Sequence, residues 1–286
     1  MTLIRILLPL LAGVGCAWWI DRSTAVRGLL PPGFAGASPI ALRRRVLAMV
    51  LLALVLSISV FAAVSQIVLP APVNEIDFER LSPVNVFLML FLMHAILVVT
   101  LSVWMVLGYR RCGHDARTVV LRQLGLRTRT GQSLPVELGI GFGTGVVLWA
   151  GVLFVLLITA LLVGAAGGFE NLPNEAPEMV LWMGSLPVLL RLMVSLSAGV
   201  VEEVFFRGFL MPRAGFVTSN VLFVLAHLSY EQPFMLLGVA LLSVGFSYLT
   251  IWRGNIWPAI AAHFLFDAIQ LLILVPTATN AAGSSL

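Results

Sequence analysis

Charge is scarce in this chain, and lysine is absent from it. Only 10% of the 286 residues are charged, and all 17 basic residues are arginine. Soluble domains carry about 25% charged residues, whereas the mean hydropathy here is +1.04. The composition therefore excludes a soluble domain and predicts an all-α, polytopic integral membrane protein.

Two further absences exclude nucleic-acid-binding and disulfide-rich proteins. No run of arginines with interleaved aromatic residues occurs, so the net charge of +4 does not indicate a nucleic-acid partner. The two cysteines, Cys16 and Cys112, are too few and too far apart to form a disulfide framework. The expected surroundings are instead a lipid bilayer, and the arginines are expected to orient the chain within it.

Eight apolar runs approach the roughly 20 residues that a membrane-spanning helix needs. The sixth run is short for a full crossing, and Pro187 offers a start for the fifth because proline breaks a longer helix. The eight runs are Leu3–Ile20, Val46–Leu69, Val84–Gly108, Val136–Ala166, Pro187–Leu210, Ala214–Leu228, Phe234–Ile251 and Trp257–Val275.

The connections between these runs alternate between arginine-rich and acidic. The connections after the first, third, fifth and seventh runs carry arginine, and the other three carry carboxylates. The positive-inside rule makes the arginine-bearing side cytoplasmic, which predicts a multi-pass protein of a plasma or inner membrane with both termini outside. The first run is expected to be a retained span, because Arg22 and Arg27 follow it.

Ionisable residues interrupt three of the late apolar runs. A charge at the centre of a membrane helix costs roughly 2.5–3.5 kcal/mol on insertion scales, so such residues usually serve a function. Glu203 and Arg207 are four residues apart and can pair on one face, whereas Glu202 is turned about 100° away. The later groups are His227, and the pair His263 and Asp267, which are also four residues apart.

These residue types suit hydrolysis of a carbonyl compound. Glu202 and His227 could take a proton from water as it attacks. His263, oriented by Asp267 or assisted by that side chain as a proton donor, could hold the developing oxyanion. The same four residues, Glu202, His227, His263 and Asp267, could also bind zinc, although a His-Glu-x-x-His motif is absent.

The ordered motifs Glu-Glu-x-x-x-Arg, Phe-x-x-x-His and His-x-x-x-Asp resemble those of the CPBP family, the CAAX proteases and bacteriocin-processing (Abi) proteins, which include type II CAAX prenyl endopeptidases. The resemblance covers Pro187–Val275. It implies an intramembrane endopeptidase in which Glu202 and His227 activate water and His263 and Asp267 form the oxyanion site. Members of the family have been described both as metalloproteases and as glutamate proteases, and we favour the metal-free mechanism. Asp267 stands where eukaryotic and archaeal CAAX enzymes usually carry asparagine. The structural residues would be Glu203, Arg207 and Phe223.

The remaining histidines and a glycine series have simpler interpretations. His94 has no partner in the pattern, so helix packing is expected. His114 lies in a charged connection and is expected to be solvated. Four glycines alternate with larger residues from Gly139 to Gly145, which predicts close helix packing within a span rather than a phosphate-binding loop.

The sequence thus predicts four generic spans in residues 1–178 and a catalytic core of four spans in residues 179–286. The expected function is cleavage of a membrane-associated, prenylated or leader-bearing protein near the cytoplasmic face. Three alternatives stay open: a non-catalytic scaffold or bacteriocin-immunity protein, a zinc-dependent protease, and a proton-coupled transporter. The transporter should show inverted repeats, and no internal repeat is visible.

Overall fold

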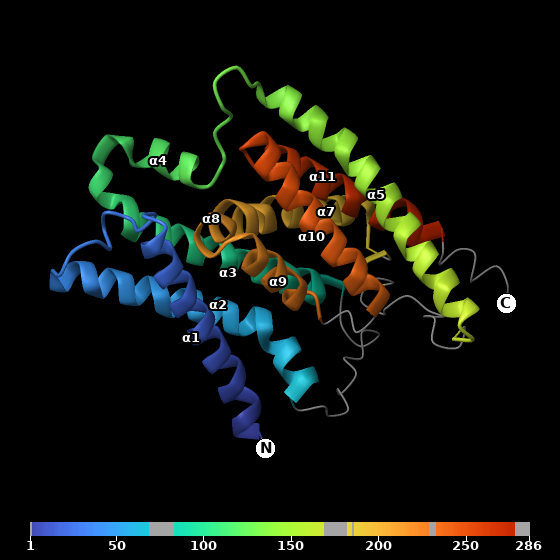
Figure 1. Ribbon diagram of the computed structural model, residues 1–286, viewed down its shortest axis with the longest axis horizontal. Helices are drawn as coiled ribbons and strands as arrows, with labels where there is room; N and C mark the ends of the chain where they lie inside the picture. The colour runs from blue at the N-terminus through green and yellow to red at the C-terminus, as the bar shows by residue number, and fades with distance from the viewer. Residues whose placement is uncertain (1, 69–82, 169–181, 185, 229–232, 278–286) are drawn as a thin grey trace.

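A computed structural model describes residues 2–68, 83–168, 182–184, 186–228 and 233–277, and these ranges contain helices without any strand. Helices lie at all eight places predicted from hydropathy, and their arrangement is shown in Figure 1. The expected all-α, polytopic membrane fold is confirmed. The predicted division between residues 178 and 179 falls outside the described residues and stays a prediction.

The N-terminal half consists of long helices and one short one. They are α1 (Thr2–Val26), α2 (Pro39–Val68), α3 (Pro83–Tyr109), a 3₁₀ turn at Arg110–Asp115, α4 (Ala116–Gln123) and α5 (Leu134–Ala165). The C-terminal half contains α7 (Val188–Glu203), a π-helix at Val204–Leu210, α8 (Met211–Ala214), α9 (Phe216–Ala226), α10 (Pro233–Arg253), α11 (Trp257–Ile269) and a second π-helix at Gln270–Leu274.

Within the described ranges, five helical segments are both long and apolar enough to cross a membrane. They are Pro39–Phe61, Phe91–Gly113, Leu134–Ala165, Pro233–Arg253 and Trp257–Thr277. The sixth predicted span is shorter than expected, since α9 has 11 residues. α7 itself has 16 residues, but its helical path continues through the π-helix and α8.

The start of α7 agrees with the prediction from proline. Pro187 precedes the first helical residue, Val188, and adopts the extended conformation that precedes a helix. After Glu203 the helix widens into the π-helix that carries Arg207. Such widened turns are rare and often lie at functional sites. The Glu-Glu-x-x-x-Arg motif therefore spans the junction between the two helix types.

The connections predicted on the arginine-rich side meet at one end of the molecule. The amide of Gly33, after α1, donates to the carbonyl of Gly108 at the end of α3, 2.7 Å away. The amide of Ile256, before α11, donates to the carbonyl of Gly125, after α4, at 3.0 Å. Gly215, before α9, lies close to the guanidinium of Arg27. The arginine-bearing connections thus lie together, as predicted, whereas the acidic connections lie mostly outside the described residues. The assignment of this end to the cytoplasm stays a prediction.

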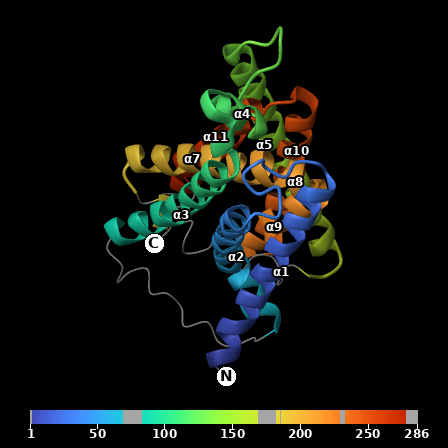
Figure 2. The same ribbon diagram turned by 90° about the vertical axis from the view of Figure 1, so that its left-hand side faces the viewer.

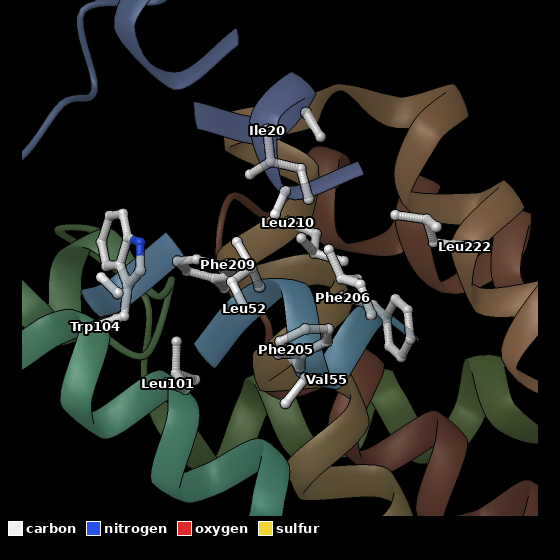
Figure 3. Packing of buried hydrophobic residues seen from close by; sticks show 14 of the residues in the cluster. Ile20, Leu52, Val55, Leu101, Trp104, Phe205, Phe206, Phe209, Leu210 and Leu222 are labelled. Carbon is white, nitrogen blue, oxygen red and sulfur yellow. The ribbon is translucent and has the colours of Figure 1, made fainter. Parts of the chain in front are cut away.

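A large apolar cluster joins the first three helices to the π-helix after α7. Figure 3 shows Phe205, Phe206 and Phe209 of that π-helix among residues of α1, α2, α3 and α9. Arg213, in the connection after the fifth predicted run, is fully buried beside this cluster. Its Nη1 donates to the Phe209 carbonyl, and its guanidinium lies 4.7 Å from the Trp104 ring centroid. A backbone carbonyl and an aromatic ring therefore serve as partners of this buried cation.

The glycine series of α5 faces α11 at two of its four members. A Cβ at Gly145 would lie 3.0 Å from the Cα of Ala262, and a Cβ at Gly141 would lie 2.7 Å from the Ala261 Cβ. Gly139 and Gly143 would meet no heavy atom within 4 Å among the described residues. The close packing predicted from the series is therefore confirmed for Gly141 and Gly145 and wrong for the other two, which point away from α11.

We expect Gly141→Ala to destabilise the protein by about 1–3 kcal/mol, because the added methyl would collide with α11. Gly143→Ala, two residues away on the same helix, is the matched control. It should be neutral or stabilising by roughly 0.5–1 kcal/mol, because alanine is the better helix former. Thermal unfolding in detergent would compare the two, and equal midpoints would contradict this helix contact.

Candidate active site

The two adjacent glutamates lie on α7 and point in different directions. α7 packs against α11 on one side and against α3 on another, as Figure 2 shows. Gly199 allows the close approach of α11, since a Cβ there would lie 2.9 Å from the backbone nitrogen of Phe264. One turn later, Glu203 is completely buried and Glu202 is partly buried. The divergence expected from helical geometry is therefore observed.

Glu203 contacts two basic side chains through a single oxygen. Its Oε1 accepts a hydrogen bond from Arg207 Nη1 at 2.9 Å and lies 2.8 Å from His263 Nδ1. The ion pair between Glu203 and Arg207 that the spacing predicted is therefore present. The contact with His263 was not predicted, and it ties α7 to α11 at the level of the site.

Arg207 is held from several sides in addition to Glu203. Its Nη2 donates to the carbonyl and hydroxyl oxygens of Ser243 on α10, at 2.9 and 3.0 Å. The Ser243 hydroxyl in turn donates to Asn220 Oδ1 on α9, at 2.6 Å. The guanidinium carbon lies 4.3 Å from the centroid of the Phe223 ring. Sequence reasoning missed Asn220 and Ser243, because such short polar residues are common in helices without any site.

Glu202 lies between two histidines from different helices. Its Oε2 is 3.7 Å from His227 Nε2, at the end of α9. Its Oε1 is 3.5 Å from His94 Nε2, on α3. The side chain of Glu202 keeps 15% of its surface exposed, yet Oε2 is buried and has no hydrogen-bond partner among the described residues.

The ring of His227 is fixed by its backbone and by an aromatic neighbour. Its Nδ1 lies 2.8 Å from the Phe223 carbonyl oxygen, which can only accept, so Nδ1 donates. In the neutral ring Nε2, the atom facing Glu202, then carries the lone pair. The Phe223 ring stacks on His227 with centroids 4.5 Å apart. The Phe223 ring also lies roughly at right angles to the His263 ring, with centroids 6.1 Å apart. Phe223 thereby links the two halves of the site.

His263 and Asp267 lie on the same face of α11, as their spacing predicted. His263 Nε2 is 3.5 Å from Asp267 Oδ2, and the ring stacks on Phe246 with centroids 4.9 Å apart. The shorter contact, however, is the one from Nδ1 to Glu203. His263 therefore has a carboxylate beside each ring nitrogen, and Glu203 is the closer of the two.

His94, for which the sequence predicted helix packing, has polar partners at both ring nitrogens. Nδ1 lies 2.7 Å from the Ser197 hydroxyl oxygen on α7, and Nε2 faces Glu202. A signal was present in the sequence, since an ionisable residue within an apolar helix is a functional candidate by itself. The partners could not be read from it, because Ser197 is 103 positions away.

The zinc alternative assigns four ligands, and in the structure these four side chains have different partners. Glu202 faces His227, whereas His263 uses Nδ1 for Glu203 and has Asp267 beside Nε2. Across the described ranges, no group of three or more His, Cys, Asp or Glu side chains is disposed to hold a metal ion.

An apolar cavity of about 280 Å³ lies between α3, α4 and the α7 region. On α3 its wall begins one turn after His94, at Leu97 and Val98, and on α7 it includes Val200 and Val201. An apolar space therefore lies between the same two helices that carry His94 and Glu202.

Comparison with known proteins gives one family. Residues 184–269 match the family described as type II CAAX prenyl endopeptidase Rce1-like. The matched segment contains all three motifs, from Glu202 to Asp267, and confirms the resemblance for this part of the chain. His94 lies outside it.

One curated relative and no solved structure match. The uncharacterized protein YpbD of Bacillus subtilis strain 168 is 30% identical over 77 residues, which are 27% of this chain. The match spans 41% of that relative's own length. No solved structure matches.

Proposed function

We propose that this chain, whose residues 184–269 match the Rce1-like endopeptidases, is an integral membrane endopeptidase that cleaves a membrane-associated protein. The observation that carries the proposal is the buried Oε2 of Glu202, which has no hydrogen-bond partner among the described residues and faces His227 Nε2 at 3.7 Å. A water molecule beside them could donate one hydrogen bond to each acceptor. Its lone pair would then be available for attack on a carbonyl.

Glu202 is the general base of the proposed reaction. The water oxygen forms a bond to the carbonyl carbon of the scissile peptide while Glu202 takes the proton. The tetrahedral intermediate then collapses, the carbon–nitrogen bond breaks, and Glu202 returns the proton to the leaving amine. His227 orients the water through the nitrogen that its Phe223 hydrogen bond leaves unprotonated in the neutral ring.

His263 is the proposed stabiliser of the oxyanion. When both ring nitrogens carry hydrogen, Nδ1–H donates to Glu203 and Nε2–H is available to the negatively charged oxygen. Asp267, 3.5 Å from that nitrogen, would donate a second hydrogen bond only in its protonated form. The cavity between α3 and α7 offers an apolar surface for the membrane-associated part of a substrate.

Chelation separates this mechanism from the zinc-dependent alternative. We expect dialysis against a strong zinc chelator to leave the cleavage rate of the purified protein unchanged. Metal analysis of the undialysed protein should find zinc well below one ion per chain. Loss of activity that returns on adding zinc would instead establish the metalloprotease, with Glu202 and the two late histidines as first candidates for ligands.

Substrate capture in native membranes tests the proposed function directly. Cells carrying Glu202→Ala in place of the wild-type chain should accumulate uncut forms of one or a few membrane-associated proteins, identified by quantitative mass spectrometry of their terminal peptides. Restoring the wild-type chain should return those peptides to their original abundance. A folded Glu202→Ala protein that leaves every membrane protein unchanged would favour the scaffold or immunity alternative.

The transporter alternative makes a different prediction from the same polar residues. A proton relay would couple solute movement to a pH gradient across proteoliposomes, and it would not change the covalent structure of any protein. The matched family is a peptidase family, which favours cleavage over transport.

We also propose that the active site faces the cytoplasm. The support is the gathering of the arginine-bearing connections at one end of the molecule, because the positive-inside rule makes that end cytoplasmic.

A further inference from the structure

α3 contributes a histidine to the site although it lies outside the matched segment. The two carboxylate oxygens of Glu202 face different imidazoles: Oε1 is 3.5 Å from His94 Nε2, and Oε2 is 3.7 Å from His227 Nε2. The His94 side chain is 16% exposed. A histidine held this deep among apolar residues needs polar partners, and His94 has one at each nitrogen.

The two histidines present different nitrogens to the carboxylate. His227 Nδ1 must donate to a carbonyl, so in the neutral ring its Nε2 is an acceptor. His94 Nδ1 instead meets the Ser197 hydroxyl at 2.7 Å, and a hydroxyl can donate as well as accept. When Ser197 donates, Nε2 of His94 carries the hydrogen and points it at Glu202. The negative charge of the carboxylate favours this tautomer.

We propose that His94 is a positioning residue, which holds Oε1 of Glu202 and thereby leaves Oε2 directed at His227 and the attacking water. The role rests on the proposed function, because it acts through Glu202. This role would make α3 part of the site. Without His94, the Glu202 carboxylate could rotate about its last bond and present either oxygen, or neither, to the water. Misplacement of a catalytic group by about 1 Å can lower a rate by about a hundredfold.

Three variants, two at position 94 and one at position 197, separate this role from packing. His94→Leu keeps the volume but removes the donor, and we expect kcat to fall by about ten- to a hundredfold with KM within about twofold of wild type. His94→Gln offers an amide hydrogen to Glu202 and should recover a large part of the rate. Ser197→Ala, which removes the partner of Nδ1, should lower kcat less than His94→Leu.

The substrate for these assays is the protein that accumulates uncut in cells with Glu202→Ala, presented to the purified full chain in liposomes. His94→Leu added to Glu202→Gln should lower the residual rate no further, because both changes act at one carboxylate. A second readout needs no substrate. The carboxylate stretching band of Glu202, identified by its loss in Glu202→Gln, should shift in the infrared spectrum of His94→Leu but not in that of His114→Leu.

The outcomes distinguish failure of this inference from failure of the proposed function. Full activity and an unshifted band in His94→Leu, together with an inactive Glu202→Gln, would overturn the positioning role alone. Equal losses of rate and of thermal stability in His94→Leu and His94→Gln would assign the residue to structure. If no protein accumulates with Glu202→Ala, the proposed function falls, and the infrared band still decides whether His94 binds the carboxylate.

Discussion

Changing Glu202 to glutamine is expected to lower the cleavage rate by about 10²- to 10⁴-fold, the usual contribution of a general base. Glutamine keeps the length of the side chain and can still contact His94, but it cannot take a proton from water. The rate would be measured on the protein captured with Glu202→Ala, using purified chains in liposomes. The thermal midpoint should stay close to the wild-type value, because Glu202 Oε2 makes no hydrogen bond within the described residues that the fold would lose.

Asp115→Asn is the control for the loss of one negative charge. Asp115 is exposed in the 3₁₀ turn after α3, far along the chain from the site, and its replacement should leave the rate unchanged. A folded Glu202→Gln protein that cleaves at the wild-type rate would remove Glu202 from the chemistry. The catalytic proposal would then fall with it.

Replacing Arg207 with methionine is expected to give the largest loss of stability. Arg207 is 1% exposed and donates to Glu203 and to two oxygens of Ser243. Breaking a buried ion pair by removing one partner costs about 3–5 kcal/mol. For a chain of this size the thermal midpoint should fall by roughly 6–20 °C. Thermal unfolding in detergent would measure the change.

Arg43→Met is the matched control, because Arg43 is exposed near the start of α2. Its midpoint should stay near the wild-type value. Adding Glu203→Gln to Arg207→Met should restore part of the loss, since the buried charge that was left unpaired is then removed. If Arg207→Met has the same thermal midpoint as the wild-type protein, the guanidinium contributes nothing to the stability of the fold. The structural role inferred from its contacts is then wrong.

Much of the site could be predicted where helical spacing alone sets the geometry. The pairing of Glu203 with Arg207, the divergence of Glu202 and the shared face of His263 and Asp267 all follow from 3.6 residues per turn. The start of α7 follows from the restricted backbone of Pro187. These relations involve residues within a few positions of one another, so no knowledge of neighbouring helices is needed.

Contacts between helices could not be read from one sequence. The approach of His94 to Glu202 depends on how α3 packs against α7, and the hydrogen bond from His263 to Glu203 depends on the closeness of α7 and α11. The burial of Arg213 has the same cause, because an arginine beside Trp104 and one beside water look alike in a sequence. In each case tertiary packing decides the partner.

Oε1 of Glu203 accepts hydrogen bonds from a structural guanidinium and lies against the imidazole proposed to hold the oxyanion. In the proposed mechanism, folding and turnover therefore share one atom, and a substitution at position 203 is expected to disturb both. Changes that tune the rate while sparing the fold are more accessible from α3, whose histidine reaches the neighbouring glutamate. Protein engineers seeking a faster or slower enzyme should therefore begin with the helix that the matched segment does not contain.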